Sequence, residues 1–113
     1  MINESLRKRL EKIHSRLTDV EQELANPEVT KNIKKMQALS IERAELLPIV
    51  ERARSLDSLI KDIETTESWT SDPELKDDAV IELDRLKKRV AEIENELKGL
   101  LLPKDPNLSL IHI

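Results

Sequence analysis

The chain has 113 residues, enough for one domain, and its 38% hydrophobic and 37% charged residues are a balance typical of amphipathic helices. One aromatic residue (Trp69), one glycine and no cysteine exclude an all-β sandwich, a glycine-rich phosphate loop, a disulfide scaffold and a cysteine-ligated zinc site. A net charge of −4 argues against a free-standing nucleic-acid binder. No membrane span or secretory signal is readable, so we expect a cytoplasmic protein.

The first predicted helix covers residues 4–25. Its apolar residues are spaced alternately by four and three, which places them on a single stripe of the helix. The stripe consists of Leu6, Leu10, Ile13, Leu17, Val20 and Leu24. Asn3 is a suitable cap for this helix. Pro27 cannot continue the hydrogen-bond ladder, so the helix should end near Asn26 and residues 26–29 should form a turn.

The second predicted helix covers residues 31–64 and carries a similar stripe, which only Glu42 interrupts. After a lead-in at Ile33 and Met36, the stripe consists of Leu39, Glu42, Leu46, Ile49, Ala53, Leu56, Ile60 and Ile63. Pro48 lies within it and predicts a kink. A single kinked helix is favoured over two helices, because the stripe keeps its phase across the proline. Residues 65–72 show no periodicity and are predicted to be a loop.

The third predicted helix covers residues 73–98, with Asp72 as its cap and Pro73 at its first position. Its stripe is the most regular of the three and consists of Ala79, Leu83, Leu86, Val90, Ile93 and Leu97. Gly99 is expected to stop the helix after Lys98. Three narrow stripes favour long, nearly parallel packing. The predicted fold is therefore all-α, an elongated three-helix bundle with coiled-coil-like packing.

No catalytic, cofactor-binding or metal-binding set is evident. His14 and His112 are the only histidines, and neither has a neighbouring nucleophile or ligand partner in the sequence. His14 is expected to be a boundary side chain at the edge of the stripe. The many carboxylates, such as Asp77 and Asp78, are expected to lie on solvent-facing sides.

Lys and Arg side chains form two clusters that are candidates for binding a partner through phosphate groups. The candidate residues are Arg7, Arg9, Lys12 and Arg16 in the first helix, and Lys31, Lys34 and Lys35 at the start of the second. Acidic residues are interleaved with them, so an ordinary solubilising surface is the alternative interpretation. Trp69 is expected either to plug the open end of the bundle or to anchor a partner.

The string Leu100-Leu101-Leu102-Pro103-Lys104-Asp105-Pro106-Asn107 resembles the link that follows the N-terminal domain of bacterial peptide chain release factors. Three shorter strings resemble the same family in the right order and at the right separation. They are Asn26-Pro27-Glu28-Val29, Leu47-Pro48-Ile49-Val50-Glu51 and Asp72-Pro73-Glu74-Leu75. The leucine-rich form of the link is more similar to the release factor 1 type, which reads UAG and UAA, than to the UGA-reading type.

The resemblance implies a role in translation termination, with residues 1–102 as a helical N-terminal domain that docks and positions the factor on the ribosome. The implied partners are the stalk base of the large subunit and the GTPase class of release factor, with no membrane and no small-molecule substrate. The chain lacks the family's Gly-Gly-Gln hydrolysis motif, since Gly99 is its only glycine, and also the codon-reading Pro-x-Thr, so no enzyme activity is expected. Residues 103–113 should lead toward a further domain, and the apolar tail 108–113 departs from the family pattern.

Two other functions remain open from the sequence alone. The regular stripes would also suit an autonomous coiled-coil scaffold or oligomerisation element, although Pro48 and three unequal helices argue against an uninterrupted rod. A tRNA-binding arm, like the helical hairpin of seryl-tRNA synthetases, would need two long helices and a basic flank, which the third helix does not fit.

Overall fold

The computed structural model describes residues 4–102, which form four helices joined by short turns. These are α1 (Glu4–Leu24), α2 (Pro27–Thr30), α3 (Ile33–Trp69) and α4 (Lys76–Leu101), and no strand occurs between residues 4 and 102. The molecule measures 63 × 40 × 22 Å along its principal axes. The predicted elongated, all-α bundle is therefore confirmed. Asn3 and the link and tail at 103–113 lie outside the described residues.

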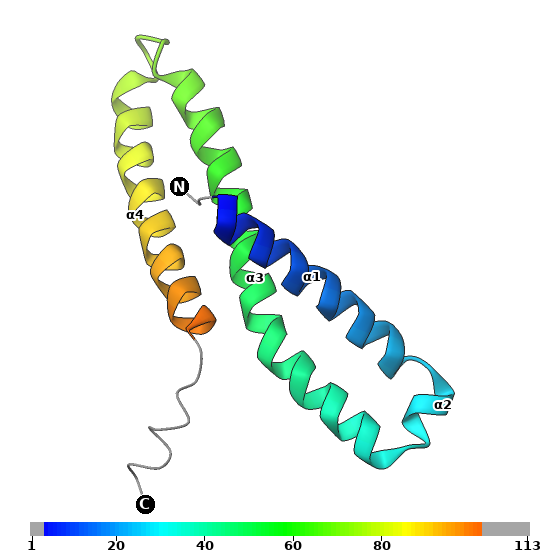
Figure 1. Cartoon of the computed structure of the whole chain (residues 1–113). Coiled ribbons are helices and arrows are strands. Elements are labelled where there is room, and N and C mark those ends of the chain that lie inside the picture. The colour runs from blue at the N-terminus through cyan, green and yellow to red at the C-terminus, as the bar shows by residue number, and fades with distance from the viewer. Residues whose placement is uncertain (1–3, 103–113) are drawn as a thin grey trace, which may run out of the picture.

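The long helix α3 is the axis of the molecule, and its two halves have different neighbours (Figure 1). Helix α1 runs along the N-terminal half of α3, and α4 runs along the C-terminal half. The beginning of α1 and the end of α4 meet near the middle of α3. The structure is thus two helical hairpins that share α3, and three helices lie together only at the middle, which the stripes alone did not indicate.

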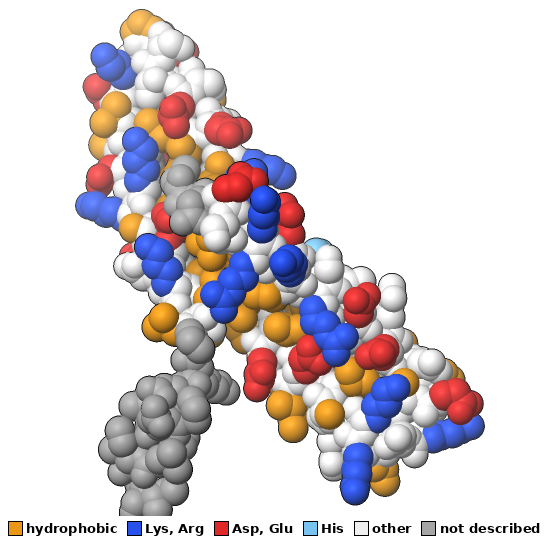
Figure 2. Space-filling model, in the orientation of Figure 1, with side chains coloured by type: hydrophobic (Ala, Val, Ile, Leu, Met, Phe, Trp, Pro, Cys, Tyr) orange, Lys and Arg blue, Asp and Glu red, His pale blue; other side chains and the backbone are white. Residues whose placement is uncertain are grey.

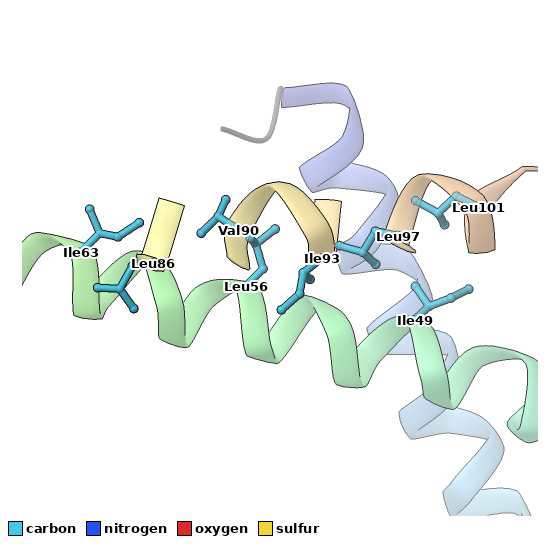
Figure 3. Packing of buried hydrophobic residues seen from close by; sticks show 8 residues of the cluster. All are labelled: Ile49, Leu56, Ile63, Leu86, Val90, Ile93, Leu97 and Leu101. Carbon is cyan, nitrogen blue, oxygen red and sulfur yellow. The ribbon is translucent and has the colours of Figure 1, made fainter. Parts of the chain in front are cut away.

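The main core lies between α3 and α4 (Figure 3). Seven of its buried members come from the predicted stripes of both helices, namely Ile49, Leu56, Ile63, Leu86, Val90, Ile93 and Leu97, and the eighth is Leu101, beyond the predicted end of the last helix. Leu6, Leu10 and Ile13 of α1 pack against this cluster with partly buried side chains. The stripes therefore form one continuous core through the middle of the molecule.

A second, smaller core closes the far end of the α1–α3 hairpin. It consists of Val20, Val29 and Leu39, with Leu24 packed against them. Val29 belongs to α2, a single helical turn in a segment predicted to be a simple turn. The turn becomes helical because the Asn26 side chain accepts a hydrogen bond from the Glu28 backbone N–H (3.0 Å) and Pro27 occupies the first helical position.

The stripe predicted for the second helix is largely correct, but one of its residues is exposed and one residue outside it is buried. Ile33, its proposed lead-in, is exposed. Val50 lies outside the predicted stripe and is buried. Val50 is buried because α3 contacts α1 and α4 on different sides and must bury more than one stripe. Helix α3 also continues through Pro48, so the prediction of one helix rather than two is confirmed.

The predicted loop at residues 65–72 is wrong over its first half, because α3 continues to Trp69. The threonine hydroxyl groups of this segment form hydrogen bonds within the helix. Thr65 Oγ1 donates to the Lys61 carbonyl (3.1 Å), and Thr66 Oγ1 donates to the Asp62 carbonyl (2.8 Å). Such back-bonding satisfies the hydroxyl without interrupting the helix.

Both predicted ends of the last helix also need correction. Helix α4 begins at Lys76 rather than Pro73, and the Asp72 carboxylate shapes the preceding turn by accepting from the Glu74 N–H (2.9 Å). At the other end α4 continues through Gly99 to Leu101, and Gly99 does not adopt a positive φ. The extension buries Leu101, the next residue in the spacing of the stripe.

Candidate partner-binding surface

The basic residues predicted on the first helix do lie on α1, at the middle of the molecule. Residues 4–16 contain five Lys or Arg and two Asp or Glu, a local net charge of +3. Figure 2 shows Lys and Arg side chains gathered over this region, where α1 lies against α3. Four of these cations were predicted as candidates, and the structure separates them by what each one contacts.

Arg16 forms a solvent-accessible ion pair with Glu42 of α3. Its Nε lies 2.6 Å from Glu42 Oε2 and its Nη2 lies 2.7 Å from Glu42 Oε1, a bidentate arrangement. Donation from Arg16 holds the pKa of the Glu42 carboxyl below its usual value, and the same hydrogen bonds raise the pKa of Arg16. Glu42, the charge that interrupts the stripe, therefore joins α1 to α3, and Arg16 is occupied.

Arg9 is occupied as well, by the end of α4. Its Nη2 donates to the carbonyl oxygen of Leu101 at 2.8 Å. Carbonyls in the last turn of a helix have no partner within the helix, and a cation there also interacts favourably with the helix dipole. Arg9 therefore caps the end of α4 from a different helix.

Arg7 and Lys12 are the two α1 candidates whose charged groups have no partner among residues 4–102, and both are exposed. Arg7 lies at the rim of a groove between α1 and α3 that also contains His14 and Arg54. His14 is exposed at this rim, as expected for a boundary side chain. The α1 patch available to a partner, defined here as Arg7 and Lys12, is smaller than the predicted cluster.

The second predicted cluster lies in the turn before α3 and in the first turn of α3, and it is a separate patch. Lys31 lies 3.6 Å from Glu28, and both side chains are highly exposed, while Lys34 and Lys35 are exposed without a partner within residues 4–102. Because α1 rises about 1.5 Å per residue, its length puts this cluster roughly 20 Å from Arg7 and Lys12. The seven candidates therefore form two patches, in which four cations remain unengaged.

The carboxylates predicted to face solvent mostly do so. Asp77 and Asp78 are exposed. Glu92 pairs with Arg89, and Glu96 lies 3.4 Å from Arg52 Nε of α3. Among residues 4–102, no three His, Asp or Glu side chains lie close enough together to hold a metal ion. No helix in this part of the chain is both long and apolar enough to cross a membrane.

Comparison with known proteins gives a consistent set of relatives. Three proteins described as peptide chain release factor 1 are 39%, 41% and 36% identical to this chain, over 102, 100 and 99 residues. They come from Aliarcobacter butzleri, Nitratiruptor sp. and Geobacter sulfurreducens, and the alignments cover 90%, 86% and 88% of this chain. They cover 29%, 28% and 28% of the relatives, so the chain spans less than a third of their length. No solved structure matches.

A match to a protein-family model supports the same relationship. The model described as the PCRF domain matches residues 13–110, which includes most of the described helices. The predicted resemblance to bacterial release factors of type 1 is confirmed by these relatives. Since the matched residues make up most of its length, the chain belongs to the PCRF domain family.

Proposed function

We propose that this chain acts in translation termination as the helical N-terminal domain of a class I release factor that reads UAG and UAA. Its task is to dock on the ribosome in the cytoplasm and to position the parts of the factor that read the codon and promote hydrolysis. The observation that carries the proposal is the PCRF match together with relatives named peptide chain release factor 1. A chain with a single glycine has no Gly-Gly-Gln motif, so hydrolysis is assigned to other regions of such a factor.

The α1 patch supports a contact with ribosomal RNA. Arg7 and Lys12 are exposed and are not held by a carboxylate among residues 4–102, so binding to phosphate breaks no internal ion pair. Arg9 and Arg16 contribute positive potential, but their guanidinium groups hold α4 and Glu42. We place this contact on the large subunit near the stalk base, with the GTPase class of release factor as a neighbouring partner.

The test is co-sedimentation of the chain with large ribosomal subunits at several salt concentrations. The double variant Arg7→Glu with Lys12→Glu should weaken association and lower the slope of log affinity against log salt by about 2. The matched control is Lys61→Glu with Lys87→Glu, the same charge change on α3 and α4 away from α1. Equal behaviour of the two double variants would reject the α1 patch, and no salt-sensitive association of the parent chain would reject docking by this domain.

The scaffold alternative loses its main support in the structure. The stripes that suggested it are buried within one molecule, including Val20, Leu56 and Leu97, whose exposure is 0%. They are therefore not available to pair with a second chain without opening the bundle. Light scattering at micromolar concentration should give a monomer, and a concentration-dependent dimer would restore the scaffold interpretation.

A further inference from the structure

A groove of about 460 Å³ lies between α3 and α4, at the end of the molecule where these helices are joined. Its floor includes Thr66, Ala79 and Leu86, which are almost fully buried, and its rim includes Trp69 and Leu75. We call this the tip groove. It is far from the α1 patch, because α1 accompanies only the other half of α3 (Figure 1).

The tip groove presents apolar surface that the fold does not use. Trp69, the only aromatic side chain of the protein, is 46% exposed, and Leu75 is 43% exposed. Ala79 is the floor residue nearest the start of α4, and its single methyl group leaves the space between the walls open. The ring is thus a partly covered apolar wall beside a hollow, rather than the plug that was one of the two sequence-based expectations.

The rim of the tip groove is acidic, with Asp62 from α3 and Asp78 and Glu82 from α4. Arg85 pairs with Glu82 and lowers the pKa of that carboxyl. Asp62 and Asp78 are exposed, and neither forms an ion pair among the described residues. Arg85 attracts Asp62 electrostatically without forming an ion pair with it, so each side of the groove keeps one carboxylate that no cation pairs with among residues 4–102.

The surroundings strengthen this negative potential. Residues 61–85 contain nine Asp or Glu and three Lys or Arg, a local net charge of −6 in a chain whose total is −4. Acidic and hydrophobic side chains are both visible at this end of the molecule in Figure 2. A phosphate group would be repelled here. A metal ion is also unsuitable, since no three carboxylates come close enough together within residues 4–102.

We propose that the tip groove binds an arginine side chain presented by a partner protein. The aliphatic stem and planar guanidinium would lie along Trp69 and Leu75, where stacking on an indole face is favourable. The charged end would lie between Asp62 and Asp78. This binding site is separate from the RNA contact proposed for α1, so either proposal stands if the other fails.

The test uses Trp69 as its own reporter, because it is the only tryptophan in the chain. The probe is the synthetic peptide acetyl-Gly-Leu-Arg-Ala-Leu-Gly-amide, titrated into the intact chain while tryptophan fluorescence and backbone amide NMR shifts are recorded. Saturable fluorescence change with shifts confined to the ends of α3 and α4 is expected. The matched peptide carries citrulline, which has the same shape without the charge, and should bind at least about threefold more weakly.

Variants of the protein distinguish binding in the tip groove from nonspecific electrostatic attraction of the peptide. Asp78→Asn should weaken binding by about two- to fivefold, whereas Asp77→Asn, the same change one residue away and outside the groove, should not. Ala79→Leu should block binding by filling the hollow, with helicity and thermal stability measured as the folding control. Equal affinity for the two peptides, equal effects of the Asp77 and Asp78 variants, or shifts in the α1–α3 groove would each overturn the proposal.

Discussion

Leu56 lies at the centre of the main core, and shortening it to alanine gives the most informative test of the packing. Its exposure is 0%, and Figure 3 shows it among Val90 and Ile93 of α4. Leu56→Ala removes apolar groups worth about 2 kcal/mol in transfer free energy. Partial relaxation of the cavity brings the total loss to about 3–4 kcal/mol of unfolding free energy. For a chain of this length, that corresponds to a drop in melting temperature of roughly 15 °C.

Urea unfolding followed by circular dichroism measures this loss directly. The control is Ile81→Ala on α4, because Ile81 is 70% exposed and should cost less than about 0.5 kcal/mol. The urea midpoint should shift while the slope of the transition stays constant, since the surface exposed on unfolding is nearly unchanged. Equal effects of the two variants, or a loss below about 1 kcal/mol for Leu56→Ala, would refute a tightly packed core between α3 and α4.

Two further predictions concern the ion pair and the cap that connect the helices. Since the pKa of Glu42 is lowered in the folded state, its pairing stabilises the fold above pH 4.5 and the stabilisation is lost as the pH falls through the folded-state pKa. Glu42→Gln should therefore flatten the dependence of the urea midpoint on pH between neutral and acidic solution, and an unchanged profile would contradict the pairing. Arg9→Met should cost about 1 kcal/mol and speed hydrogen exchange in the last turn of α4. Arg7→Met should leave that exchange unchanged, so equal exchange in both variants would contradict the cap.

The sequence was most informative where the pattern repeats. The alternating spacing of four and three identified the core positions of α1 and α4, because such a spacing keeps residues on one side of a helix whatever it packs against. The same pattern does not say which part of one helix meets which part of another. The division of α3 between α1 and α4 therefore came only from the structure, although the buried Val50 outside the stripe reflects it.

The helix ends were predicted poorly because local preference and tertiary contact disagree there. Gly99 favours a stop, but burial of Leu101 and the hydrogen bond from Arg9, 92 residues away, outweigh that preference. The candidate cations show the same difficulty. Arg16 and Lys12 look equivalent in the sequence, and only the position of Glu42, 26 residues from Arg16, distinguishes an occupied cation from an available one.

The two proposed binding surfaces carry opposite charge and lie at different positions along α3, so together they can determine how the molecule is oriented on its partners. The positive α1 patch lies beside the middle of α3, and the acidic tip groove lies at its C-terminal end. Trp69 lies sixteen positions after Ala53 in the same helix, which is roughly 24 Å at about 1.5 Å per residue, so the two surfaces are held at a fixed separation. An assembly with RNA at one position and a basic protein at the other matches this charge order in one orientation only. The reversed orientation would place phosphate against carboxylates, so helix α3 itself would supply the orientation that a positioning domain requires.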